Sequence, residues 1–99
     1  MRLYKLAADQ ANAVAQNDLG FMYENGRGGL PKNDRQAARF YKLAADQGNA
    51  FGQTNLAFLY QNGRGGLPKD DREAARLYKL AADQGHDSAK QALAKLGGS

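Results

Sequence analysis

The chain has 99 residues, 42% apolar and 24% charged, which is an ordinary globular composition with room for one domain and a modest core. It contains no cysteine, so disulfides and thiolate metal sites are excluded. The net charge of +4 favours acidic partners, but no long basic run indicates nucleic acid.

The first segment of the chain is repeated. RLYKLAADQ at residues 2–10 returns as RFYKLAADQ at 39–47 and again as RLYKLAADQ at 76–84, each 37 residues further on. NGRGGLPK at 25–32 recurs at 62–69 with the same spacing. A fixed period of this length indicates a solenoid, in which each unit buries its apolar face against its neighbours. The opening is amphipathic and no run of about 18 apolar residues follows, so we expect a soluble chain without a leader or membrane span, whose compartment stays unknown.

Each unit is predicted to contain two amphipathic helices. Phe40, Leu43 and Ala44, for example, lie at i, i+3 and i+4, and no segment alternates with the period of a strand. We call the first helix of a unit, at 12–25 and equivalent positions, the A helix. The second, at 34–47 and equivalent positions, is the B helix.

The ends of these helices carry local signals. Asn33 with Gln36, and Asp70 with Glu73, have the spacing of an N-terminal capping box. Glycines suited to a left-handed terminal residue follow both kinds of helix; they are Gly26, Gly48, Gly63 and Gly85. Ala11 breaks this rule, so the first B helix is expected to end under strain or at a shifted position.

The period divides the chain as one solenoid domain. We expect a partial repeat at 1–11 with a B helix only, full repeats at 12–48 and 49–85, and a C-terminal capping helix with a tail at 86–99. The similarity of the two full units, the abrupt start and the final Gly-Gly-Ser are consistent with an excised or engineered piece of a longer array.

Two segments resemble a known family over essentially the whole chain. AQNDLGFMYENGRG at 15–28, followed by KNDRQAARFYKLAADQG at 32–48, is similar to the Sel-one-like repeat (SLR) family of tetratricopeptide-like repeats. The resemblance implies an all-α, right-handed superhelix of about five helices. It also implies a non-catalytic scaffold that binds a protein or peptide through a concave surface lined by A helices.

The family pattern places eight A-helix residues on the concave surface as partner-binding candidates. They are Val14, Asn17, Phe21 and Glu24 in the first full unit and Phe51, Thr54, Phe58 and Gln61 in the second. Phe51 is the better candidate, because Val14 and Ser88 replace it in the other units and a core position would not accept all three. Phe21 and Phe58 have an alternative role as core between repeats.

NGRGGLPK is expected to be the structural turn between the A and B helices of a unit. The alternative is an anion-binding or electrostatic edge formed by Arg27, Lys32, Arg64 and Lys69. A phosphate-binding loop would need a preceding strand and a Gly-Lys-Ser/Thr ending, which are missing. Acidic residues in the same strip also argue against nucleic-acid binding.

Catalysis, metals and cofactors are not expected. The chain has one histidine, His86, and few hydroxyl nucleophiles, and we interpret His86 and Asp87 as the start of the last A helix. A second hypothesis is a structural, self-associating module. Leu3, Tyr4 and Leu6 of the opening B helix would then stack on another copy of the chain.

Overall fold

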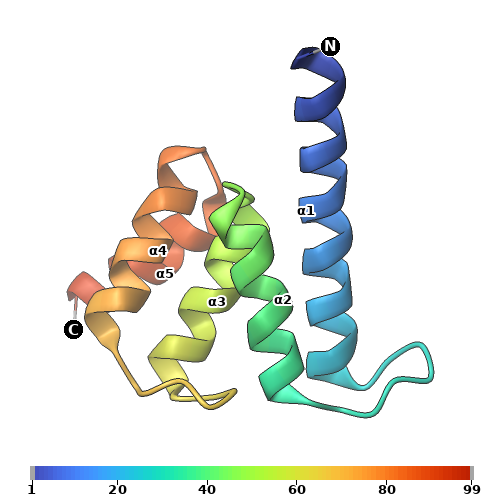
Figure 1. The fold of residues 1–99 in the computed structure, drawn as a ribbon. Helices are drawn as coiled ribbons and strands as arrows, with labels where there is room; N and C mark the ends of the chain where they lie inside the picture. Colours follow the sequence, from blue (N-terminus) through green and yellow to red (C-terminus); the bar gives the residue numbers. More distant parts are fainter. Residues whose placement is uncertain (1, 99) are drawn as a thin grey trace.

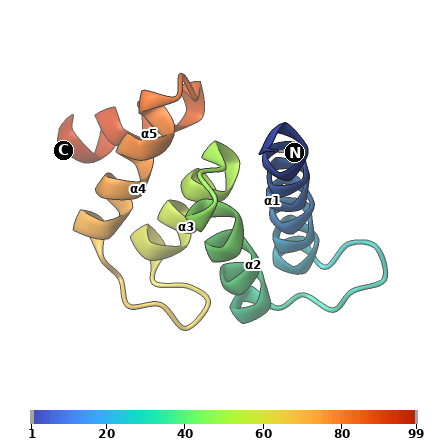
Figure 2. The same ribbon diagram turned by 45° about the horizontal axis from the view of Figure 1, so that its top comes forward.

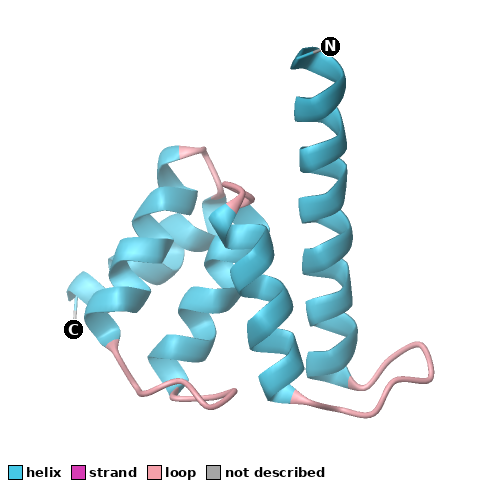
Figure 3. Cartoon of the chain, viewed as in Figure 1, coloured by secondary structure: helices cyan, strands magenta, loops and turns pink. Residues whose placement is uncertain are grey.

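The computed structural model describes residues 2–98, and the side chains of residues 12–97 (Figure 1). Five helices and the loops between them make up this part of the chain, with no strand in it (Figure 3). The helices are α1 (Arg2–Asn25), α2 (Asp34–Asp46), α3 (Ala50–Asn62), α4 (Asp71–Asp83) and α5 (Asp87–Gly98). Each packs on the next along the chain, so the described part is an all-α repeat solenoid, as the period predicted.

The B helices begin at the predicted N-caps. The side chain of Asn33 accepts hydrogen bonds from the backbone N–H groups of Arg35 and Gln36, both at 3.1 Å. Asp70 accepts from the N–H of Glu73 at 3.0 Å. The carboxylate of Glu73 bonds the guanidinium of Arg76. One arm of each predicted capping box is therefore present, and it satisfies amides that the first helical turn leaves without partners.

Glycine ends the helices where the chain must turn. Gly63, at the end of α3, has φ of +62°, and Gly48, between α2 and α3, has φ of +85°. Positive φ places a Cβ against the backbone, so glycine is the residue that adopts it at little cost. All positive-φ residues of the described chain are glycines.

The start of the solenoid differs from the expected division. A B helix ending near Ala11 and a separate A helix from residue 12 were expected, but α1 is one continuous helix of 24 residues. Ala11 stands where Gly48 and Gly85, with φ of +85° and +88°, turn the chain in the other units. Alanine favours the helical conformation and resists positive φ, so the helix runs on.

Aromatic and small side chains form the core. Tyr41, Tyr78 and Leu59 are the largest fully buried side chains, and alanines of the B helices let the helices approach closely. Leu56 is buried at 5% exposure, whereas the equivalent Leu19 of α1 is 36% exposed. Leu19 was expected to be framework, and it is exposed because no B helix covers that side of α1. Among the described helices none is both long and apolar enough to span a bilayer.

Candidate protein-binding face

Four apolar residues of α1 and α3 are exposed on one side of their helices. Val14 is 51% exposed and Phe21 43% on α1, and Phe51 is 58% exposed and Phe58 45% on α3. Each pair is seven residues apart, which puts its members on one helix face. The structure therefore keeps Phe21 and Phe58 at the surface, and the alternative role as core does not apply. We call the surface around these four residues the A-helix face.

The two small polar candidates are held by hydrogen bonds. Asn17 accepts a hydrogen bond at 2.9 Å from Asn55 Nδ2, which links α1 to α3. Thr54 Oγ1 donates to the carbonyl oxygen of Ala50 at 2.8 Å within its own helix. Both side chains are half-buried, so their contribution to the A-helix face is partial.

The last two candidates hold the buried tyrosines of the B helices. Glu24 accepts a hydrogen bond from the hydroxyl of Tyr41 at 2.5 Å, and Gln61 accepts from the hydroxyl of Tyr78 at 2.8 Å. Burial, and then the bond to Glu24, raise the pKa of Tyr41 far above its ordinary value. Burial also raises the pKa of Tyr78. Glu24 and Gln61 thus have a structural role at equivalent positions.

Two hollows adjoin the exposed aromatic residues. One, of about 290 Å³, has Phe58 and Gln61 on one side and residues of α5 on the other. The remaining lining residues are Tyr78, Ser88, Gln91, Ala92 and Lys95. The second, of about 320 Å³, lies between Val14 and Phe51, beside the α2–α3 turn. Both are open depressions at the surface of a size that holds side chains of a partner.

Two residues near these hollows were missed by sequence reasoning. His86 packs edge-on against Phe51, with ring centroids 4.7 Å apart, so it fixes one side of that ring. Lys95 adds a cation to the hollow beside Phe58. The comparison of units offered a weak signal, since both residues lie where the capping helix departs from the repeat.

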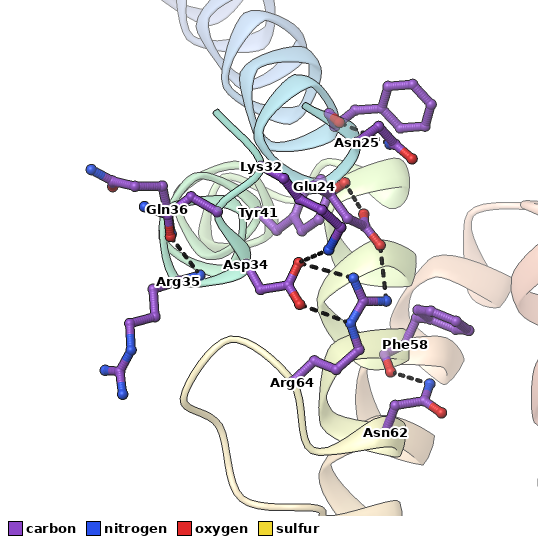
Figure 4. Close-up of polar contacts among 12 residues, drawn as sticks. Glu24, Asn25, Lys32, Asp34, Arg35, Gln36, Tyr41, Phe58, Asn62 and Arg64 are labelled. Atoms are coloured by element: carbon purple, nitrogen blue, oxygen red, sulfur yellow. Dashed lines mark hydrogen bonds and ion pairs between the residues drawn. The ribbon is translucent and has the colours of Figure 1, made fainter. Parts of the chain in front are cut away.

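The edge residues of the glycine-rich loops have different environments. Arg64 Nη2 lies 2.9 Å from Asp34 Oδ1, and Arg64 Nη1 lies 3.2 Å from Glu24 Oε2 (Figure 4). Arg64 thus joins the loop of one repeat to both helices of the preceding repeat. Arg27, at the equivalent position, lies 5.3 Å from the ring centroid of Phe21 and forms no ion pair with a described residue.

The charges around Arg64 disfavour an anion at this loop. The hydrogen bond from Arg64 holds the pKa of Asp34 below its ordinary value, and the same bond raises the pKa of Arg64. Lys32 and Lys69 each pair with an aspartate of the following helix, at 3.4 Å and 3.2 Å. An incoming anion would therefore meet carboxylates that already occupy these cations.

Chemistry that would support catalysis or a metal is not assembled in the described part of the chain. No group of three His, Cys, Asp or Glu side chains there could hold a metal ion. His86 contacts Phe51, as described above, and its hydrogen bond through the backbone carbonyl to the N–H of Lys90 belongs to the first turn of α5.

The repeat pattern and the fold define the class of this protein. The family model for the Sel1 repeat matches residues 1–12, 13–49 and 50–86, so the chain belongs to the Sel1 repeat family. Proteins of this family generally act as scaffolds for protein–protein interactions and are typically non-catalytic. No curated protein matches the chain significantly.

Solved structures of two relatives share the fold. A Sel1 repeat protein from Oxalobacter formigenes is 39% identical with a TM-score of 0.81, over 88% of this chain and 35% of that protein. A protective antigen present in uropathogenic Escherichia coli strains, which displays an SLR fold, is 38% identical with a TM-score of 0.81, over 90% of this chain and 19% of that one. The chain thus spans about a third and about a fifth of these relatives.

Proposed function

We propose that the A-helix face binds a peptide segment of a partner protein. The observation that carries this proposal is the exposure of Val14, Phe21, Phe51 and Phe58 on two neighbouring helices whose opposite sides are packed. Rings that remain exposed in a folded solenoid are suited to accept apolar side chains of a partner. This is the role that the family resemblance gives to the A helices.

The charges near the aromatic rings indicate the chemistry of the partner. Arg27 lies over Phe21, and Lys95 lines the hollow next to Phe58. An apolar side chain seated beside Phe58 would place neighbouring groups of its peptide near Lys95. The preferred ligand is therefore a segment with an apolar anchor next to an acidic residue, which also suits the net charge of +4.

A displayed library of short peptides, sorted by affinity for the purified chain, tests this proposal. The selected peptides are then measured by fluorescence anisotropy against the Phe51→Ala, Phe58→Ala double variant. Removal of two aromatic anchors should weaken binding at least tenfold, because such residues contribute about 1–2 kcal/mol or more each.

The matched control is the Leu43→Ala, Leu80→Ala double variant. These leucines are similarly exposed, at 40% and 41%, but lie on the B helices. Circular dichroism must show equal helicity for both double variants. The proposal fails if the two variants bind the selected peptides equally well.

A further inference from the structure

One side of α1 is bare where the equivalent helices are covered. Ala15 is exposed, whereas Gly52 of α3 and Ala89 of α5, at the same position of the repeat, are buried. Leu19 shows the same contrast with the buried Leu56. The uncovered side of α1, around Ala15 and Leu19, is therefore the side that a preceding B helix covers elsewhere in this chain.

The contact between α2 and α3 shows how such a side is covered. A Cβ built on Gly52 would lie 2.7 Å from the Cβ of Ala44 and 2.9 Å from the backbone nitrogen of Ala45. The helices are thus in close contact at this point, on either side of the turn at Gly48. The B helix reaches the next A helix because this glycine reverses the chain.

The chain carries a segment that matches the uncovered side of α1. Residues 2–10 have the same sequence as residues 76–84, which lie in α4 and its C-cap and precede the equivalent turn before α5. In α1, however, these residues continue straight into the A helix, and the first turns of α1 extend beyond α2 (Figures 1 and 2). A straight helix cannot place its first half against its own second half.

We infer that two copies of this chain exchange these halves and form a symmetric dimer through antiparallel α1 helices. Residues 2–10 of each copy take the place of the missing B helix on the uncovered side of α1 of the other copy. The donor segment and its acceptor are both present twice, so the exchange is reciprocal and closed.

The repeat fixes the register of this pairing. Ala44 faces Gly52 in the α2–α3 contact, and 37 residues earlier these positions are 7 and 15. Residue 7 of one copy therefore lies opposite residue 15 of the other. This register also places residue 11 opposite its own copy, so the two-fold axis passes through Ala11. A register taken from a contact between different helices thus satisfies the symmetry that a dimer requires. This inference does not depend on ligand binding by the A-helix face.

Disulfide trapping of the Ala7→Cys, Ala15→Cys double variant tests the inference, since the chain has no other cysteine. Within one straight helix these positions are about 12 Å apart, beyond the reach of a disulfide. Mild oxidation at micromolar concentration should give a covalent dimer on a non-reducing gel. A bridge within one chain, or no bridge at all, would overturn the inference. The Ala94→Cys variant, with its cysteine at an exposed position of α5, controls for random oxidation.

The Ala11→Gly variant provides a second measurement that needs no cross-link. Glycine permits the turn seen at Gly48 and Gly85, so residues 2–10 can fold back on their own chain. Light scattering after size exclusion should show a dimer for the original chain and a monomer for Ala11→Gly. The Ala94→Gly variant carries the same helix penalty at an exposed site and should remain dimeric. A monomeric original chain at high concentration contradicts the inference.

Discussion

Arg64 reaches back to Asp34, 30 residues earlier, and forms a two-pronged contact with its carboxylate. Arg64 Nε lies 3.0 Å from Oδ2 and Nη2 lies 2.9 Å from Oδ1. The same guanidinium contacts Glu24, which also accepts the hydroxyl of the buried Tyr41. The arginine of the repeated loop therefore fastens one repeat to the preceding one, and four side chains of the first two repeats share one network (Figure 4).

Replacement of Arg64 by alanine should destabilise the fold by about 1–2 kcal/mol, because two half-buried carboxylates lose a charged donor. The partial exposure of the pair keeps the effect below that of a fully buried ion pair. Arg27→Ala is the matched control at the same position of the other loop, where only the contact with Phe21 is lost. Urea unfolding of both variants measures the difference, and equal losses would contradict the role of Arg64.

The Asp34–Arg64 pair should make stability depend on acid pH. The folded pKa of Asp34 lies below the unfolded value of about 3.9. The pair therefore contributes fully above the unfolded pKa, and the contribution is lost as pH falls through the folded pKa. Urea unfolding should show Asp34→Asn less stable than the original chain at pH 7, with the gap closing below about pH 4. A gap of constant size down to about pH 2.5 would refute this prediction.

The Tyr78→Phe variant should be less stable by about 1 kcal/mol, because its hydroxyl donates to Gln61 in the half-buried interface of α3 and α4. Tyr23→Phe is the control. Tyr23 stacks on Phe40 with ring centroids 5.7 Å apart, and a phenyl ring keeps that contact. Thermal unfolding by circular dichroism compares the two variants. A similar change for both would show that the Gln61 bond contributes nothing.

Gly65→Ala should cost about 2–4 kcal/mol, and Gly28→Ala, at the same position of the first loop, about 1 kcal/mol. Both glycines have positive φ, of +72° and +65°. A Cβ on Gly65 would also lie 2.7 Å from the backbone oxygen of Asp34 and 2.9 Å from the Cβ of Ala38. A Cβ on Gly28 would meet only the flexible end of Met22. Equal destabilisation in urea would mean that close packing on α2 is unimportant.

The sequence alone determined most of the fold. The 37-residue period, the helical spacing of Phe40, Leu43 and Ala44 and the N-caps Asn33 and Asp70 located the helices to within a few residues. These signals are local, since a cap or a left-handed glycine acts on amides within one turn of itself. The repeat supplied the non-local information, because identical units can bury their apolar faces only by stacking.

Tertiary structure decided which polar and aromatic residues are free. From sequence, Glu24 and Gln61 were binding candidates, but the packing of the B helices brings Tyr41 and Tyr78 against them. Arg64 looked like part of an edge, and the stacking of repeats gave it two carboxylates. Residues so far apart in the chain meet only when the helices pack, so no local pattern marks them.

The behaviour of Ala11 lies between these two cases. Sequence comparison of the units identified it as an exception, but local propensity alone left a strained end and a shifted end equally open. The structure shows a helix that continues to Asn25, which leaves one side of α1 uncovered at Leu19. Whether a helix turns back depends on the residue at the turn and on the surface against which the returning segment packs, and that surface exists only in the folded protein.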